Sequence, residues 1–309
     1  MNNRLLSGWS WTSRFSPPPL VDAHSVQQIY RAANSPDAGS LLAQREVQQI
    51  LLGERQSAFV GRGYEFAENR LYSAGDEARF INWRLLARTG QLYRKTFYEE
   101  RRPPVWLILD RSASMRFGTR TRLKIAQAAQ LALFHLFLAQ RHSLLTGAVL
   151  IDEIPTWFAP AQDRGSQQAL IRALCAATPP LAEDAPTATL RSVLEQTQVQ
   201  LAPGCIVILY SDFHELQASD MPMLHALAQT HTLYARHIID VSEQTLPADG
   251  EYDFARQDEQ TTLDCSDSAL TAAYAQRMQH RHNEIATWFQ QAGIAYARYR
   301  ADDDILSAA

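Results

Sequence analysis

The chain has 309 residues, of which 46% are hydrophobic and 20% charged, a composition typical of a globular protein with one large or two modest domains. Its formal net charge of −4 argues against a dedicated nucleic-acid binder, because such proteins carry a strongly basic surface. No apolar run reaches the roughly 18 residues of a membrane span, and the N-terminus lacks the continuous apolar core of a signal peptide, so we expect a cytoplasmic protein.

Residues 1–60 are predicted to form a leader followed by two short helices. The prolines at 17–19 close the leader, because proline opposes helix and favours extended backbone. Helices are predicted at about 22–33 and 39–53, and the second of them ends at Gly53.

Residues 61–104 have a different character. They contain nine Lys and Arg against six Asp and Glu, and short aromatic stretches alternate with turn-forming residues, which is typical of strands joined by turns. The arginines and aromatic residues between 79 and 102 allow an alternative, single-stranded nucleic-acid binding by base stacking. We favour the interpretation in which these arginines form ion pairs with the acidic residues at 76–77 and 99–100.

Residues 105–309 alternate between apolar strands and longer helical patterns. Strands are predicted at 105–109, 144–151, 153–160, 205–212, 232–240 and 294–299. Helices are predicted at 121–141, 166–175, 189–200, 219–229 and 267–291, with a small hairpin formed by 249–257 and 260–266. This alternation predicts a doubly wound, mostly parallel α/β sheet.

Polar side chains follow two of the apolar strands. Asp110 ends the first of them, and Ser112 and Ser114 come next at alternate positions, so that in an extended loop both hydroxyls point the same way as the carboxylate. Asp212 ends the second strand. Ligands of parallel sheets bind beyond the carboxyl ends of the strands, near the point where the strand order reverses. Carboxylate and hydroxyl oxygens suit hard divalent cations, so these residues predict a Mg²⁺ or Mn²⁺ site.

The alternative is a purely structural role, in which Asp110 and the two serines cap the next helix, since Asp and Ser are common at helix N-termini. Two features favour the cation site instead. The sequence has a strand–loop–helix context at this point, and the second strand also ends in an acid, in the pair Ser211-Asp212.

The Asp-x-Ser-x-Ser pattern at 110–114 resembles the metal site of von Willebrand factor A domains. The resemblance implies a von Willebrand A-like fold whose bound cation keeps an open coordination position, which an Asp or Glu of a protein ligand can fill. That family normally adds a threonine from a Gly-Thr loop, whereas residues 185–190 contain no glycine. The best alignment places Ala188 at the threonine position. A one-residue shift offers Thr187 as the ligand; otherwise Thr187 and Thr189 cap the following helix.

Residues from about 60 to about 300 resemble the family catalogued as domain of unknown function 58. The matching motifs are Gly61-x-Gly63-x-Glu65-Phe66, Arg70-x-Tyr72, Gly75-Asp76-Glu77, Ile81-Asn82-Trp83, Ala87-Arg88-Thr89, Glu99-Glu100 and Ser211-Asp212-Phe213. Asn82 stands where the family usually has Asp, so that charge is absent here. The resemblance implies a MoxR-type AAA+ ATPase as partner, in a system that matures or remodels other proteins.

Together these patterns predict a non-enzymatic scaffold that binds protein through a metal. The alternative is a Mg²⁺- or Mn²⁺-dependent phosphoester hydrolase that uses the same acids, but the sequence offers no candidate base near Ser112 and Ser114 and no phosphate-binding loop. The three cysteines and nine histidines show no metal-binding spacing, so we expect free thiols and no zinc site.

Overall fold

A six-stranded sheet forms the centre of the molecule. The computed structural model describes residues 18–35, 60–98, 103–178, 188–247, 250–256 and 259–305. The strands of the sheet are, in chain order, β3 (Val105–Asp110), β4 (Thr146–Ile151), β5 (Thr156–Ala161), β6 (Ile206–Ser211), β7 (Thr232–Ile239) and β10 (Ala295–Arg300). Their order across the sheet is β10-β7-β6-β3-β4-β5, and every neighbouring pair is parallel except β4 with β5. The predicted doubly wound, mostly parallel sheet is confirmed.

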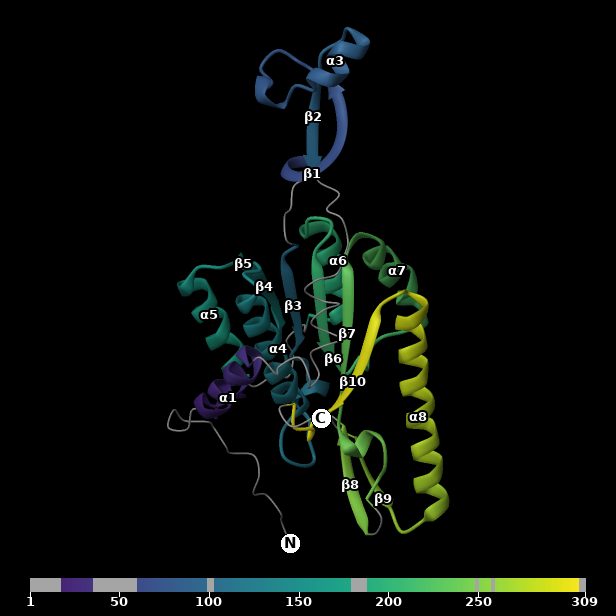
Figure 1. Cartoon of the computed structure of the whole chain (residues 1–309). Helices are drawn as coiled ribbons and strands as arrows, with labels where there is room; N and C mark the ends of the chain where they lie inside the picture. The colour runs from purple at the N-terminus through teal and green to yellow at the C-terminus, as the bar shows by residue number, and fades with distance from the viewer. Residues whose placement is uncertain are drawn as a thin grey trace.

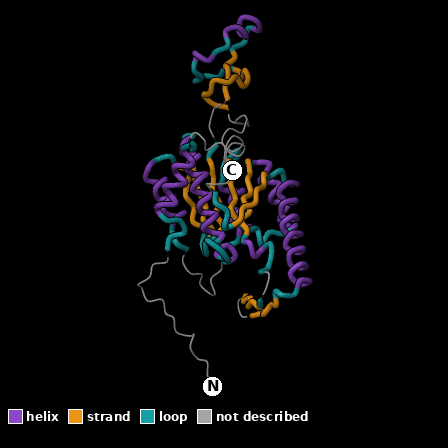
Figure 2. The backbone as a smooth tube through the Cα atoms, turned by 60° about the horizontal axis from the view of Figure 1, so that its bottom comes forward, coloured by secondary structure: helices purple, strands orange, loops and turns teal. Residues whose placement is uncertain are grey.

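The central strand β3 separates two hydrophobic cores. Its side chains alternate between the faces of the sheet, with Val105, Leu107 and Leu109 in one core and Trp106 and Ile108 in the other. A strand that is apolar on both faces is expected where helices cover both sides of a parallel sheet. Figure 2 shows this layering, with the strands lying between helices.

Two sets of helices cover the two faces. On the first face lie α1 (Ala23–Asn34), α4 (Lys124–Arg141) and α5 (Arg164–Cys175). On the second face lie α6 (Leu190–Gln200), α7 (Met221–Thr230) and α8 (Ser268–Gln291). The strands and helices predicted from residue 105 onward are therefore found within a few residues of their expected positions. No helix within the described ranges is both long and apolar enough to cross a membrane.

Helix α4 is buried along almost its whole length. Of its 18 residues, 15 are buried, because the sheet covers one side while α1 and α5 pack on the others. The helix begins at Lys124, three residues later than predicted, since residues 111–123 form a loop at the end of the sheet. A Cβ at Gly118 would lie 2.3 Å from the carbonyl oxygen of Arg122, so this loop folds back on itself closely enough to require glycine.

Helix α1 packs against α4. The ring of Tyr30 meets the ring of Phe137 edge-on, with centroids 5.2 Å apart, and the Arg141 guanidinium donates to the carbonyl oxygen of Ala33 at 3.2 Å. The first predicted N-terminal helix is thus confirmed and shares the core of the α/β sheet. The second, at 39–53, lies outside the described residues, and the predicted division of the chain at residues 60 and 104 stays a prediction.

A separate hairpin unit precedes the sheet in the chain. Its elements are β1 (Val60–Leu71), α3 (Trp83–Thr89) and β2 (Tyr93–Tyr98), and the two strands pair antiparallel. The predicted strands are confirmed, but the prediction of strands and turns alone is wrong because it omits α3. This short helix forms because the Asn82 side chain accepts a hydrogen bond from the Leu85 N–H at 3.2 Å, and Gly90, with φ of 71°, closes its last turn. Figure 1 shows the unit beyond one end of the sheet.

Ion pairs organise this hairpin unit. Arg70 and Arg94 each lie 2.6 Å from Oδ1 of Asp76, and Arg79 pairs with Glu77 at 2.5 Å. The prediction that arginines between 79 and 102 pair with nearby acids is confirmed for Arg79 and Arg94. The other two predicted acids lie outside the described residues. The predicted second hairpin is also present, as β8 (Glu251–Arg256) with β9 (Glu259–Asp264), and Figure 1 shows it at the opposite end of the sheet.

Candidate metal centre

The candidate site lies at the carboxyl ends of β3 and β6, which are neighbours in the middle of the sheet. From β3 the chain proceeds outward to β4 and β5, and from β6 it proceeds outward in the other direction to β7 and β10, so the strand order reverses between β3 and β6. Ligands of open α/β sheets bind at such a switch point. Asp110 is the last residue of β3 and Asp212 follows the last residue of β6, so both predicted acids lie there.

The loop after β3 brings the two serines together, although it is not extended as predicted. Asp110 Oδ1 accepts a hydrogen bond from the Ser112 N–H at 2.9 Å. Ala113 has helical dihedral angles (φ −56°, ψ −41°) and opens a 3-10 turn. The hydroxyl oxygens of Ser112 and Ser114 are consequently 3.3 Å apart, close enough to act on one ion.

The helix-cap interpretation of these residues is wrong. Helix α4 begins at Lys124, its N-cap position is Leu123, and no side chain caps it. The 3-10 turn that starts at Ser114 also has no side-chain cap. Asp110 instead accepts a hydrogen bond within its own loop and another from the neighbouring strand, so its position at the strand end is not explained by helix capping.

Asp110 is buried beside another negative charge. It is 5% exposed, and its Oδ2 accepts a hydrogen bond from the Ser211 hydroxyl at 2.5 Å. Burial and repulsion from Asp212 raise the pKa of Asp110 to about 6, against the effect of these hydrogen bonds. A positive ion placed between the two carboxylates would relieve that repulsion.

Asp212 is followed directly by a residue with an unusual backbone conformation. Phe213 has a positive φ of 50°, which is uncommon for a residue other than glycine. Asp212 Oδ1 accepts the His214 N–H at 3.0 Å, while Oδ2 accepts from the Lys124 ammonium at 2.8 Å. Burial alone would raise the pKa of Asp212, but the charge and hydrogen bond of Lys124 hold it below the usual value.

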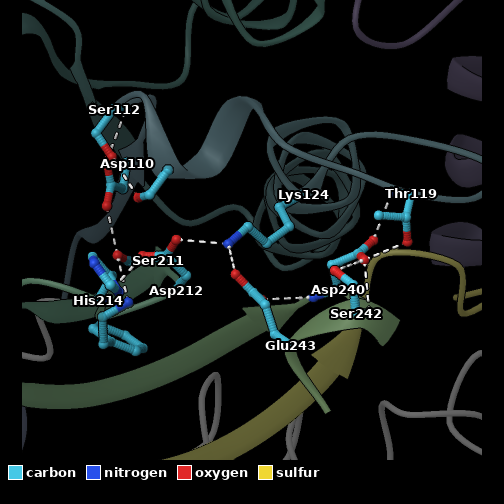
Figure 3. A network of polar contacts seen from close by, with 12 residues as sticks. Asp110, Ser112, Thr119, Lys124, Ser211, Asp212, His214, Asp240, Ser242 and Glu243 are labelled. Carbon is cyan, nitrogen blue, oxygen red and sulfur yellow. Dashed lines mark hydrogen bonds and ion pairs between the residues drawn. The ribbon is translucent and has the colours of Figure 1, made fainter. Parts of the chain in front are cut away.

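Lys124 links the site to the end of β7, a connection that sequence reasoning missed. Its side chain is 1% exposed, and its ammonium contacts both Asp212 and Glu243 (Figure 3). Glu243 Oε2 in turn accepts the Asp240 N–H at 2.8 Å, and Asp240 accepts the Thr119 N–H at 2.9 Å. Burial alone would lower the pKa of Lys124, but the charges of the two carboxylates raise it. One signal was available: a lysine at the start of an apolar helix in a chain with two lysines.

A small pocket joins the predicted residues. Its volume is about 20 Å³, and its walls include Asp110, Ser112, Ser114 and Asp212. Further walls come from the first turn of α6 and from residues 213–216. Because one water molecule needs about 10–15 Å³, the pocket has room for a small cation whose remaining ligands come from outside.

Residues 68–284 match the family model described as "Protein of unknown function DUF58". The chain belongs to the DUF58 family. Uncharacterized proteins of Mycobacterium tuberculosis and Mycobacterium bovis are 25% identical to this DUF58 protein over 273 residues, a region that covers 86% of this chain and 84% of theirs.

Solved structures similar to the DUF58 protein have low identity to it. The conserved hypothetical protein BatB from Bacteroides thetaiotaomicron is 14% identical, with a TM-score of 0.42, over 67% of this chain and 94% of that one. A von Willebrand factor type A structure from Catenulispora acidiphila is 19% identical, with a TM-score of 0.32, over 47% of this chain and 34% of that one. The strand order and direction of the DUF58 protein's own sheet define its fold as the predicted doubly wound, mostly parallel α/β sheet.

Thr187 lies outside the described residues, so its role as a ligand stays a prediction. Its neighbour Thr189 is the N-cap of α6 and accepts the Ser192 N–H at 3.1 Å, which confirms the cap interpretation for Thr189. Ala188, at the aligned threonine position, has no side-chain oxygen to offer.

The donors present in the DUF58 protein fit a hard divalent cation. Asp110, Ser112, Ser114 and Asp212 offer only oxygen atoms, which Mg²⁺ and Mn²⁺ prefer. Within the described part of the chain, His, Cys, Asp and Glu side chains form no group of three or more suited to a metal. A cation at this place would therefore depend on the two serine hydroxyls as well as on the acids.

Proposed function

We propose that this DUF58 protein is a non-enzymatic scaffold that binds a protein partner through a divalent cation, Mg²⁺ or Mn²⁺. The supporting observation is the meeting of two buried carboxylates and two hydroxyls at the switch point of the sheet, beside a pocket. Asp110, Ser112 and Ser114 would hold the cation. Asp212 would reach it through water, since its Oδ2 already binds the Lys124 ammonium.

The partner's role follows from the small number of protein ligands. Mg²⁺ requires six oxygen ligands and keeps several waters when the protein supplies only a few. An Asp or Glu carboxylate exposed on a partner would replace one of these waters and add the negative charge that the cation still lacks. The family resemblance suggests a MoxR-type AAA+ ATPase as that partner. No bond is broken in this mechanism.

Cation binding is the first prediction. In a calorimetric titration of the purified chain with Mn²⁺, Asp110→Asn should weaken binding by at least about tenfold, because a ligand and its charge are lost. The double variant Ser112→Ala with Ser114→Ala should weaken binding as well. The control is Asp163→Asn, which changes an exposed acid that caps α5 far from the site. Equal Mn²⁺ affinity in the chain with and without Asp110 would contradict the proposal.

The second prediction is that binding of the protein partner requires the divalent cation. With a purified MoxR-type ATPase immobilised, both chelation by EDTA and Asp110→Ala should abolish capture of the folded chain. Capture that survives both changes would contradict a metal bridge. Steady hydrolysis of a generic phosphoester that requires Asp110 would instead indicate a metal-dependent hydrolase.

A further inference from the structure

A buried ammonium group lies directly behind the candidate cation site. The Lys124 Nζ is 2.8 Å from Asp212 Oδ2 and also donates to Glu243, and Figure 3 shows it between these two carboxylates. Helix α4, which Lys124 begins, covers the opposite face of the sheet from α6, whose first turn lines the pocket. The ammonium therefore approaches Asp212 from the side away from the pocket.

This ammonium and a divalent cation would share one carboxylate. Two positive charges beside the same carboxylate repel each other, and burial strengthens the repulsion because it lowers the effective dielectric constant. An exposed lysine would swing into water and avoid this repulsion. Lys124 is 1% exposed and fixed by two carboxylates, so its charge stays beside Asp212 whether or not a cation binds.

We propose that Lys124 is a resident counter-ion that limits the affinity of the site for divalent cations. Its ammonium holds the Asp212 carboxylate in place without a metal through the 2.8 Å contact, and its positive charge weakens the binding of one. The inference rests on the proposed cation site and describes how that site is regulated. It follows that a free cation binds weakly and that a partner's carboxylate is needed to complete the charge balance.

Glu243 sets the strength of this effect. Its carboxylate neutralises part of the ammonium charge and is itself fixed by the Asp240 N–H at 2.8 Å. Without Glu243, the positive charge of Lys124 would act on the cation with less compensation. Removing Lys124 and removing Glu243 should therefore change the cation affinity in opposite directions, whereas a merely structural role would weaken binding in both cases.

The test measures Mn²⁺ affinity by calorimetry in the full chain and its variants. Lys124→Met, which replaces the side chain by an uncharged one that is one atom shorter, should raise the affinity by about tenfold or more. Glu243→Gln should lower it. The matched control is Lys95→Met, because Lys95 is the other lysine of the chain and is exposed on β2.

Each result decides the inference. Unchanged or weaker Mn²⁺ binding by Lys124→Met overturns the inference while leaving the proposed cation site intact, provided the unmodified chain binds Mn²⁺. If neither the unmodified chain nor Lys124→Met binds Mn²⁺, both the inference and the cation site fail. Binding by Lys124→Met alone supports the inference most directly.

Folding of the variants needs its own measurement. Lys124→Met leaves two buried carboxylates without their cation, so its thermal midpoint in chelator should fall and should rise with Mn²⁺ more than that of the unmodified chain. If Lys124→Met does not fold under either condition, Lys124→Gln decides the inference, because its neutral amide also removes the positive charge but can still donate hydrogen bonds to the two carboxylates. Unchanged affinity in that variant would overturn it.

Discussion

At the scale of single residues, buried His135 makes stability depend on pH. Its Nδ1 lies 2.8 Å from the Tyr210 hydroxyl oxygen, and burial together with the charge of Arg236 lowers the pKa of His135 to about 3. An unfolded histidine has a pKa of about 6.5. Below that pH, His135 is protonated in the unfolded chain but stays neutral in the native state. The stabilisation is complete above about pH 6.5 and is lost as the pH falls toward 3.

Replacing His135 with a group that does not titrate should remove this dependence. Between about pH 6 and pH 4, the free energy of unfolding of the unmodified chain should fall more steeply than that of His135→Asn, by about 1.4 kcal/mol per pH unit. Urea unfolding at several pH values measures both slopes. His280→Asn, at an exposed position of α8, controls for the substitution itself. Equal slopes for His135→Asn and the unmodified chain would contradict the prediction.

The candidate site shows which residues a sequence can predict. Asp110, Ser112 and Ser114 are close in sequence and follow an apolar strand, so their spacing indicates a shared site even though the loop geometry differs from the expected one. Lys124 bonds to partners 88 and 119 residues away in sequence. No local pattern reports such contacts, and only the sheet topology brings them together.

At the scale of elements, Asp76 holds the β1–β2 unit together. Its carboxylate accepts hydrogen bonds from Arg70 and Arg94 and from the Ser73 N–H, joining both strands to the turn between them. Asp76→Ala should loosen this unit locally, since the two arginines lose their shared partner. Hydrogen exchange of residues 70–95 should become faster, with the thermal midpoint of the α/β sheet unchanged.

A neighbouring acid provides the control for Asp76. Glu77 pairs with Arg79 on the exposed side of the same turn, so Glu77→Ala removes a charge of the same sign without uncoupling the strands. Exchange rates that rise equally in both variants would show that Asp76 has no special role.

The same unit shows where periodicity is insufficient. Helix α3 has seven residues, too few for a helical period to stand out from aromatic and basic neighbours, and its start depends on the Asn82 cap. The strands β3 and β6 were predictable because five consecutive apolar residues in each fit a strand buried on both faces. Local sequence thus identifies elements that are long or uniformly apolar better than short capped ones.

At the scale of the whole molecule, the two hairpins lie at opposite ends of the sheet, and the candidate site shares its end with β8 and β9 (Figure 1). The alternation of strands and helices predicts parallel pairing, because parallel neighbours need a crossover between them. The docking of α1 on α4 was not predictable in this way. It depends on contacts such as Arg141 with Ala33, 108 residues apart.

If α1 is part of the α/β core, its removal from that core should destabilise the whole sheet rather than free one helix. Ile29 is 1% exposed and belongs to the same hydrophobic core as Leu107 and Phe137. Ile29→Ala should lower the free energy of unfolding by about 2–5 kcal/mol, the usual cost of truncating a buried isoleucine, and should do so within a single urea transition. Ile154→Ala makes the same change at a position 80% exposed and should cost about 0.5 kcal/mol or less. An unchanged urea midpoint in Ile29→Ala would contradict this prediction. It would show that α1 detaches locally without lowering the stability of the sheet.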